Sequence, residues 1–484
     1  MQRGTAKFTM TAARKLPGLC ARLLAGSAWV GLCACASPLS RQPVTLPFST
    51  PATWSSRVAG GSPLDARALA SWWMQFRDPV LDLLIAEALR SSPDVRTALS
   101  RVAEFRARRG VERANLFPSL TASASGGATR TRNRDTSLTT TNESYAASLD
   151  ASWQVDLFGR QRQALAAASA DLAQTEEDYH GAQVSLAADV ASAYVTLRAA
   201  EAQLAVVRRS LGTRVETVQL TQWREQAGTG DALDTQQSLA TLEVARASIP
   251  ALQLTVTQTR NQLALLAGRT PGALDPLLAA PGDVPAAPAD FAIGIPAEML
   301  RQRPDVRAAE HGLEAAFART QAARRQRLPA LTLSGSIGVE ALRAGRLFDP
   351  VTTVASLFGG LTAPIFDAGR IGQTIAIQSE LEQQSLDAYE ATVLAALGEV
   401  ENALAAVQRN TERLVILTRA TAAAREAAKL SAMKYQAGQV DLLVSLDAQR
   451  TLLDLEQQAV TTAAGRASAC VQLYKALGGG WSPL

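Results

Sequence analysis

The feature that most constrains this chain is an internal duplication with an offset of 210 or 211 residues. The motif "PDVR" occurs at 93–96 and again at 304–307, and "DLFGR" at 156–160 parallels "FDAGR" at 366–370. Further along, the same offset relates the following glycine pairs: Gly228 with Gly438, and Gly268 with Gly478. Each copy is several times longer than a solenoid repeat, so the sequence predicts two large and equivalent structural units.

Both copies predict the same order of elements: a helix, two strands, a long helix, a tight turn and a second long helix. The 484 residues, 47% of them hydrophobic, suffice for a sizeable core. The first unit is expected at 71–269, with strands at about 118–130 and 145–157 and a hairpin tip at about 226–231. An extended Pro/Ala-rich linker follows at 270–296. The second unit is expected at 297–478, with strands at about 329–341 and 353–366 and a tip at about 436–441, and a tail follows at 479–484.

The long helix expected from Arg160 to Ala227 carries an apolar stripe whose spacings of seven and four residues average about 3.57 residues per turn. Such a helix stays nearly straight and reaches about 100 Å at 1.5 Å per residue. Its other faces mix Ala, Gln, Ser and Thr, and small residues allow neighbours to approach on two sides. We therefore expect long helices packed side by side into a wall rather than a two-stranded coiled coil.

The sequence "QAG" closes the long helix in both copies. Gly228 and Gly438 suit the left-handed residue that ends a helix, and Asp231 and Asp441 suit the N-cap of the next one. All four are expected to be structural, because each occurs in both copies.

Asp447 and Arg450 break this symmetry, since Gln237 and Ala240 occupy the equivalent positions. A residue needed only to build the hairpin should occur twice. Two interpretations remain open: an ion pair between residues three apart on a helix surface, which contributes little, or a role specific to the second tip.

The chain begins with a secretory signal pattern at 1–34. Five basic residues before residue 35 precede the apolar stretch "LLAGSAWVGLCAC". The rest of the chain has 43 basic and 44 acidic residues, so nucleic-acid binding is not expected. The ending "LCAC" resembles a lipobox, which marks Cys35 as the acylation site and 35–70 as an extended N-terminal segment. Ala36 after it favours the outer membrane by the same resemblance. Lipidation of Cys35 would leave Cys470 without a disulfide partner.

Four strands per chain with weak alternation are compatible with a membrane sheet. No open sheet edge survives in lipid, because unpaired backbone groups are costly there. Four strands cannot close a barrel, eight would fill their own interior, and twelve from three chains would leave a lumen.

Five motifs in this order resemble the TolC-like outer-membrane efflux proteins, in particular the lipoprotein (NodT-type) branch that serves resistance-nodulation-division multidrug pumps. They are "WWMQFRDPVLDLLIAEAL" (72–89), "GIPAEMLRQRPDVRAAE" (294–310), "LTAPIFDAGR" (361–370), "YQAGQVDLLVSLDAQRTLL" (435–453) and "LYKALGGGW" (473–481). The resemblance implies a homotrimer, mainly α-helical, with a shared 12-stranded outer-membrane β-barrel and a periplasmic α-barrel. Its tips would meet a periplasmic adaptor protein and an inner-membrane pump.

The resemblance also implies a periplasmic gate. Leu443 and Asp447 match family positions that constrict the closed entrance, and Arg450 matches an arginine expected to tie neighbouring helices shut. Some members carry an aspartate at the position of Val444 and a basic residue at that of Val440. Both positions are apolar here.

No pattern for catalysis, cofactor binding or metal binding is found. His180 and His311 each stand alone in a helical pattern, and neither a phosphate-binding loop nor a nucleophile elbow occurs. We expect no enzyme but a passive exit duct for drugs or other small toxic compounds. Protein secretion with an ABC transporter and heavy-metal efflux remain alternatives, as does a trimeric surface stalk or adhesin.

Overall fold

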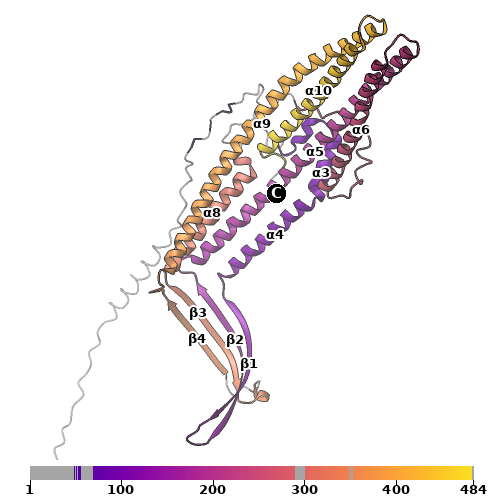
Figure 1. Ribbon diagram of the computed structural model, residues 1–484. Coiled ribbons are helices and arrows are strands. Elements are labelled where there is room, and N and C mark those ends of the chain that lie inside the picture. The colour runs from indigo at the N-terminus through magenta and orange to yellow at the C-terminus, as the bar shows by residue number, and fades with distance from the viewer. Residues whose placement is uncertain are drawn as a thin grey trace, which may run out of the picture. The chain divides into compact units, whose positions relative to one another are not determined.

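The computed structural model describes residues 48, 49, 51, 53–55, 69–288, 300–347, 349 and 353–481. The predicted signal sequence and Cys35 lie outside these residues. The chain forms two compact units, a strand unit that includes Asn115–Gln163 and Gln321–Ile375, and a helical unit that includes Leu46–Ala114, Ala164–Thr320 and Ala376–Leu484. Figure 1 shows the elements of both.

The strand unit is one antiparallel four-stranded sheet in the order β1-β2-β3-β4. Its strands are β1 (Ser119–Arg132), β2 (Thr139–Val155), β3 (Ala330–Ala341) and β4 (Thr353–Thr362). Each copy of the duplication supplies one hairpin. The central pairing of β2 with β3 joins the two copies, which leaves β1 and β4 as the edges.

The sheet has one apolar and one polar face. This division between the faces is clearer in the paired strands than in the loose alternation of the sequence. Directly paired residues share a face. The register places Leu149 opposite Ala122 and Ile337, and Asp150 opposite Thr121 and Ser336. The apolar face also carries Leu120, Trp153, Leu331, Leu333, Leu357 and Leu361. No part of the described chain covers this face around Leu357, which is 88% exposed.

The strand ends differ from the predicted ones in two places. The hairpin of β1 and β2 extends into the polar tract expected as a loop, because paired threonines favour strand geometry and only 133–138 remains for the turn. Strand β4 ends at Thr362 rather than near residue 366. Pro364 follows shortly after and has no N–H for a ladder.

The helical unit confirms the duplication, because equivalent helices have equal lengths. Helices α5 (Arg160–Gln226) and α9 (Arg370–Gln436) have 67 residues each, while α6 (Ala232–Leu266) and α10 (Leu442–Ala476) have 35 each. The shorter helices are η1 (Trp72–Phe76), α3 (Pro79–Ser91), α4 (Pro93–Ala114) and α8 (Pro304–Arg324). The 3-10 turns η2 (Arg325–Arg327) and η3 (Ala344–Arg346) belong to the strand unit. None of the described helices is long and apolar enough to cross a membrane.

Each returning helix ends against the start of its own copy. Gly268 and Gly478 follow α6 and α10 with φ of +67° and +74°. An added Cβ would lie 2.5 Å from the Ser91 carbonyl oxygen at Gly268, and 3.0 Å from Arg303 Cα at Gly478. Glycine is thus required at each position for two reasons: the backbone is left-handed, and another segment approaches too closely for a side chain.

The apolar stripe of α5 is most deeply buried in its middle. Val190 and Leu197 lie in the main core, where the buried Trp72 stacks on Tyr474 with ring centroids 5.2 Å apart. Val215, near the tip, is exposed. The stripe is therefore longer than the surface that this single chain can cover.

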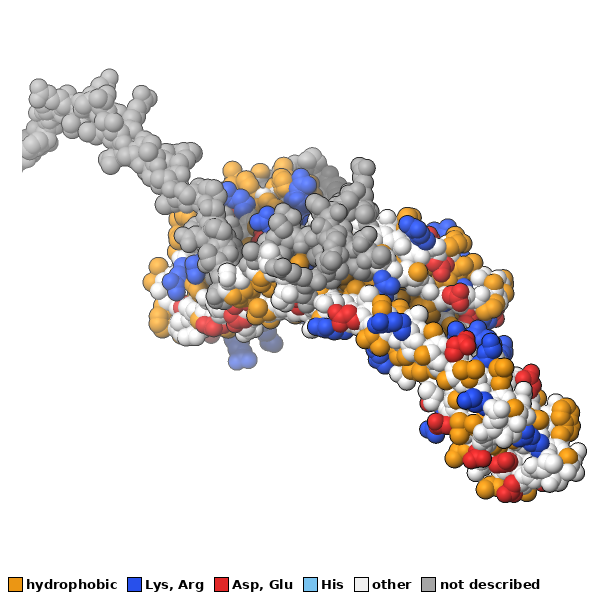
Figure 2. Space-filling view, turned by 90° about the horizontal axis from the view of Figure 1, so that it is seen from above, with side chains coloured by type: hydrophobic (Ala, Val, Ile, Leu, Met, Phe, Trp, Pro, Cys, Tyr) orange, Lys and Arg blue, Asp and Glu red, His pale blue; other side chains and the backbone are white. Residues whose placement is uncertain are grey.

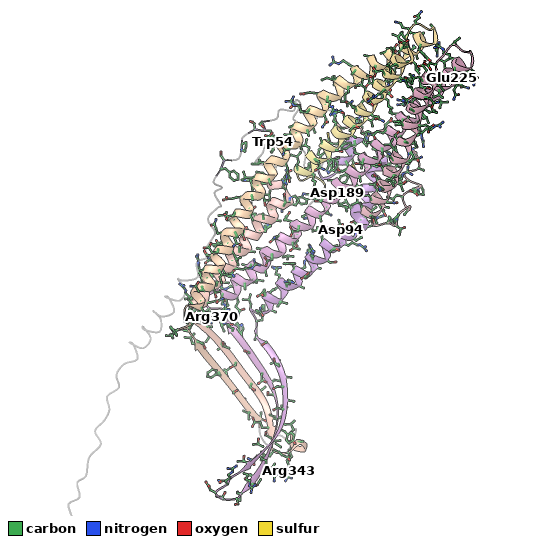
Figure 3. The ribbon with its side chains drawn as sticks, in the orientation of Figure 1. Trp54, Asp94, Asp189, Glu225, Arg343 and Arg370 are labelled. Carbon is green, nitrogen blue, oxygen red and sulfur yellow. The ribbon has the colours of Figure 1, made fainter. Side chains whose placement is uncertain are left out.

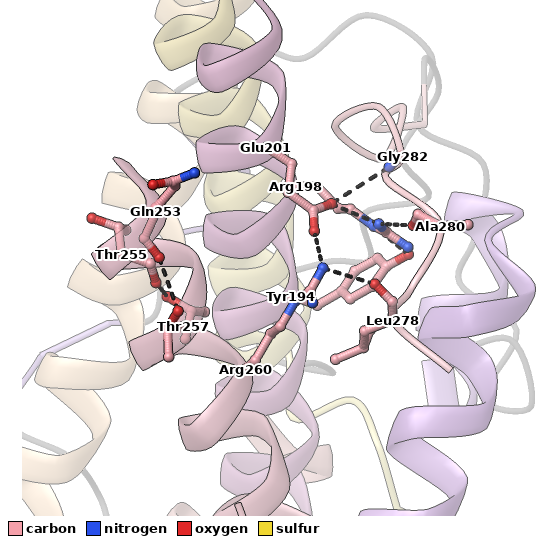
Figure 4. Close-up of polar contacts among 11 residues, drawn as sticks. Tyr194, Arg198, Glu201, Gln253, Thr255, Thr257, Arg260, Leu278, Ala280 and Gly282 are labelled. Atoms are coloured by element: carbon pink, nitrogen blue, oxygen red, sulfur yellow. Dashed lines mark hydrogen bonds and ion pairs between the residues drawn. The ribbon is translucent and has the colours of Figure 1, made fainter. Parts of the chain in front are cut away.

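The linker after α6 forms turns at 271–278, where an extended segment was expected, while 281–288 has no assigned secondary structure. A buried charge network holds it (Figure 4). Arg198 donates to Glu201 Oε2 (2.7 Å) and to the Ala280 carbonyl (2.8 Å), and Arg260 donates to Glu201 Oε1 (2.8 Å) and to the Leu278 carbonyl (2.9 Å). The linker is held at this point because two of its carbonyls accept hydrogen bonds from arginines.

Candidate functional site

The two hairpin tips have the same backbone. The amide of Gly228 donates to the carbonyl of Glu225, and that of Gly438 to the carbonyl of Tyr435, both at 3.0 Å. Both glycines are left-handed, with φ of +72° and +71°, and nothing lies near an added Cβ. The expected glycine stops are therefore confirmed, and the tips are open surfaces.

The helix starts after the tips differ. The Asp231 carboxylate caps α6 by accepting from the Leu233 amide at 3.0 Å. The Asp441 side chain makes no capping hydrogen bond, so the expectation of a second side-chain cap is wrong. Only its backbone carbonyl serves the turn, by accepting from the Val444 amide at 3.2 Å.

The residues expected at a gate form an exposed stripe along the first turns of α10. Leu443 is 67% exposed, and Asp447 and Arg450 are exposed as well. Their spacing of four and then three residues places them on one helix face. The packed face consists of Leu442, Ser445, Leu446 and Gln449.

The ion pair left open between Asp447 and Arg450 is absent from the described residues. Arg450 instead lies 4.0 Å from Asp454, one turn further along α10, and both of these side chains are largely exposed. Such a pair contributes little to stability. Within the described residues, Asp447 therefore does not form the ion pair with Arg450 that the first interpretation requires.

Arg224 fastens the two hairpins together just behind their tips. It donates to the carbonyls of Tyr435 (2.9 Å) and Gln436 (3.1 Å) at the C-terminus of α9, and its guanidinium lies 4.5 Å from the centre of the Tyr435 ring. A cation at this end also complements the helix dipole. Sequence reasoning missed this contact, because Arg224 and Tyr435 are 211 residues apart in the chain and no local pattern relates them.

The histidines have packing partners. His180 stacks on Trp481 with ring centroids 4.3 Å apart, and His311 Nδ1 lies 3.0 Å from a carboxylate oxygen of Glu314. Within the described part of the chain, no cluster of three or more His, Cys, Asp or Glu side chains could hold a metal ion. Cys470 is a free, buried thiol, and burial raises its pKa to about 12.

On the face shown in Figure 2, basic and acidic side chains are interspersed and form no single basic patch. This agrees with the near-neutral charge expected after removal of the basic N-terminus.

Comparisons with known proteins agree with this geometry. The model of the family "Outer membrane efflux protein" matches residues 84–269 and 295–479, one match for each copy. The toluene efflux pump outer membrane protein TtgF of Pseudomonas putida is 34% identical over 417 residues, 85% of each chain. The pyoverdine export outer membrane protein OpmQ of Pseudomonas aeruginosa is 33% identical over 468 residues, 94% of this chain and 96% of that protein.

Among solved structures, the outer-membrane channel OprN matches with a TM-score of 0.85 and 32% identity, and the match covers 93% of this chain and 100% of that one. The chain belongs to the outer membrane efflux protein family and is the outer-membrane channel component of an efflux system.

Proposed function

We propose that three copies of this chain form one passive duct, which exports drugs or other small toxic compounds delivered by a resistance-nodulation-division pump through a periplasmic adaptor. The relatives TtgF and OpmQ, named for toluene and pyoverdine, support small molecules as the exported class. The duct needs no catalytic activity of its own. Protein secretion and metal efflux have no feature in the described residues that favours them.

The observation that carries this proposal is the two-faced sheet with two free edges. A large uncovered apolar face suits lipid, and the opposite face, which is mostly polar with several serines, threonines and Asp150, suits a water-filled lumen. The unpaired edges of β1 and β4 require partners in lipid. Three copies would pair β1 of each with β4 of the next and close a twelve-stranded sheet.

The gate is proposed at the second tip. Leu443, Asp447 and Arg450 are exposed in the single chain and lie on one face of α10. A threefold axis would bring three copies of this stripe together. The three Leu443 and three Asp447 side chains would constrict the entrance, and because clustered carboxylates attract cations, the Asp447 ring would favour cations there. Arg450 would hold neighbouring helices in the closed arrangement.

The tips themselves are proposed as the adaptor contact. Gly228 and Gly438 have open space around them, and Asp231 and Asp441 are exposed beside them. Acylation of Cys35 would anchor the N-terminus in the outer membrane. Loss of labelled palmitate incorporation in a Cys35→Ala variant would test that anchor.

Conductance in planar bilayers tests the duct and its gate together. Purified protein should have three times the subunit mass and form conducting channels. Asp447→Ala combined with Arg450→Ala should raise the single-channel conductance, because both the carboxylate ring and the helix tie are removed. The matched control is Gln237→Ala in the first copy, where the equivalent of Arg450 is already Ala240; it should leave conductance unchanged. Equal conductance of both variants would remove the gate assignment, and a monomer without conductance would refute the duct.

A further inference from the structure

The chain contains a template for its own subunit contact, because α5 of the first copy packs against helices of the second. Arg307 on α8 lies 2.5 Å from Glu177 on α5, and the Glu177 side chain is only 7% exposed. Towards the tips, Arg224 on α5 binds the end of α9 at Tyr435, which is 5% exposed. The two copies thus contact each other through two arginines, Arg224 of the first copy and Arg307 of the second.

The duplication assigns an equivalent to each of these residues. Arg96 on α4 corresponds to Arg307, and Asp387 on α9 corresponds to Glu177. Both retain the sign of charge that the internal ion pair requires. Both are exposed, and neither forms an ion pair within the described part of its own chain.

The tip region repeats this relation. Lys434 corresponds to Arg224, and Glu225 corresponds to Tyr435. Both are exposed, and Figure 3 shows Glu225 near the tip of the first hairpin. The pair again combines a cation with a group that attracts one, now a carboxylate instead of an aromatic ring.

The apolar residues near the tips also differ between the copies: the side of α5 that packs on the second copy is covered, whereas the equivalent side of α9 is exposed. Leu220 on α5 is partly buried against Leu442 and Leu446 of the second hairpin. Its equivalent on α9, Leu430, is 55% exposed. The equivalents of Leu442 and Leu446, Ala232 and Gln236, are exposed as well.

We infer that a second copy of this chain covers the open side of α9, with Asp387 against Arg96 of the neighbouring subunit and Lys434 against Glu225 of that same neighbour. The inference rests on the proposed oligomeric duct and specifies its contacts. A second copy is the favoured occupant because it presents both opposite charges at the spacing that the internal contact already uses. Head-to-tail repetition of one such contact generates a closed ring when the rotation between neighbours closes, as the proposed duct requires.

Thiol cross-linking in the full-length, membrane-inserted protein tests this contact. Arg96→Cys combined with Asp387→Cys, treated with a short bismaleimide, should give bands of two and three subunit masses on a denaturing gel. The matched control is Arg307→Cys with Glu177→Cys, which should link within one chain and migrate as a monomer. The parent chain should give no ladder, because Cys470 is buried, and the predicted signal cleavage and acylation leave no free thiol from Cys20, Cys33 or Cys35.

Charge reversal provides an independent measurement. Arg96→Glu or Asp387→Arg alone should lower the trimer fraction in mild detergent severalfold by light scattering, and the double variant should restore it. The contact is overturned if the cysteine pair yields only monomers while light scattering shows a trimer, or if the double variant is no better than the single ones. In both cases the proposed duct stands. A protein that is monomeric throughout would overturn the duct instead.

Discussion

The two copies share a backbone but have different chemistry at their centres. In the first copy, the buried network of Tyr194, Arg198, Glu201 and Arg260 binds linker carbonyls. The equivalent residues of the second copy are Leu404, Gln408, Thr411 and Cys470, in the same order. Leu404 and Cys470 belong to the apolar core.

The difference follows from what each copy must hold. The first copy precedes the linker, whose carbonyls need donors, and the buried Arg198 and the partly buried Arg260 supply them. The second copy instead packs on the N-terminal η1, where Trp72 stacks on Tyr474. Duplication thus preserves the turns and helix lengths, while the side chains at equivalent positions adapt to whichever segment lies against them.

Removing the central carboxylate should give the largest contrast between the copies. Glu201→Leu leaves the buried Arg198 and the partly buried Arg260 without a counter-charge, which should cost about 3–5 kcal/mol. The equivalent change, Thr411→Val, should cost less than about 1 kcal/mol because it removes only one helix-backbone hydrogen bond. Chemical denaturation of both variants measures the difference, and equal losses would show that the network is not stabilising.

Substitution of the glycines that follow α6 and α10 should give the next largest difference in stability between the two copies. Gly268→Ala places a methyl group against a backbone oxygen and should cost about 3 kcal/mol, from overpacking together with the left-handed backbone. Gly478→Ala meets its nearest atom 0.5 Å further away and should cost less. Gly228→Ala, in open space, should show only the backbone cost of about 1 kcal/mol. Thermal unfolding should rank the three variants in this order.

The helix starts at the tips should show the smallest contrast. Asp231→Ala removes a side-chain cap and should cost about 1 kcal/mol. Asp441→Ala removes no cap and should change the free energy of unfolding by a few tenths of a kcal/mol. Hydrogen exchange of the amides in the first turn of each helix measures this locally. Equal increases in exchange after both substitutions would show that Asp441 also caps its helix in solution.

The sequence predicted the repeated elements well because backbone requirements leave local signals. Arg160–Gln226 matches the expected helix to within one residue, and the glycines mark the tips. Contacts over long range were not predictable in this way. The order in the linker depends on Arg198 and Arg260, and the attachment of the tips depends on Arg224, each far from its partner in the chain. The missing cap at Asp441 reflects a side-chain orientation that residue type does not determine.

The equal lengths of α5 and α9, and of α6 and α10, restrict how this family member can evolve. One extra residue in α5 alone would advance its tip by about 1.5 Å and rotate every following side chain by about 100°. Arg224 would then point away from the end of α9. Insertions should therefore survive only when both copies receive them together or when they span whole turns, so the duplicated halves are bound to change length in step.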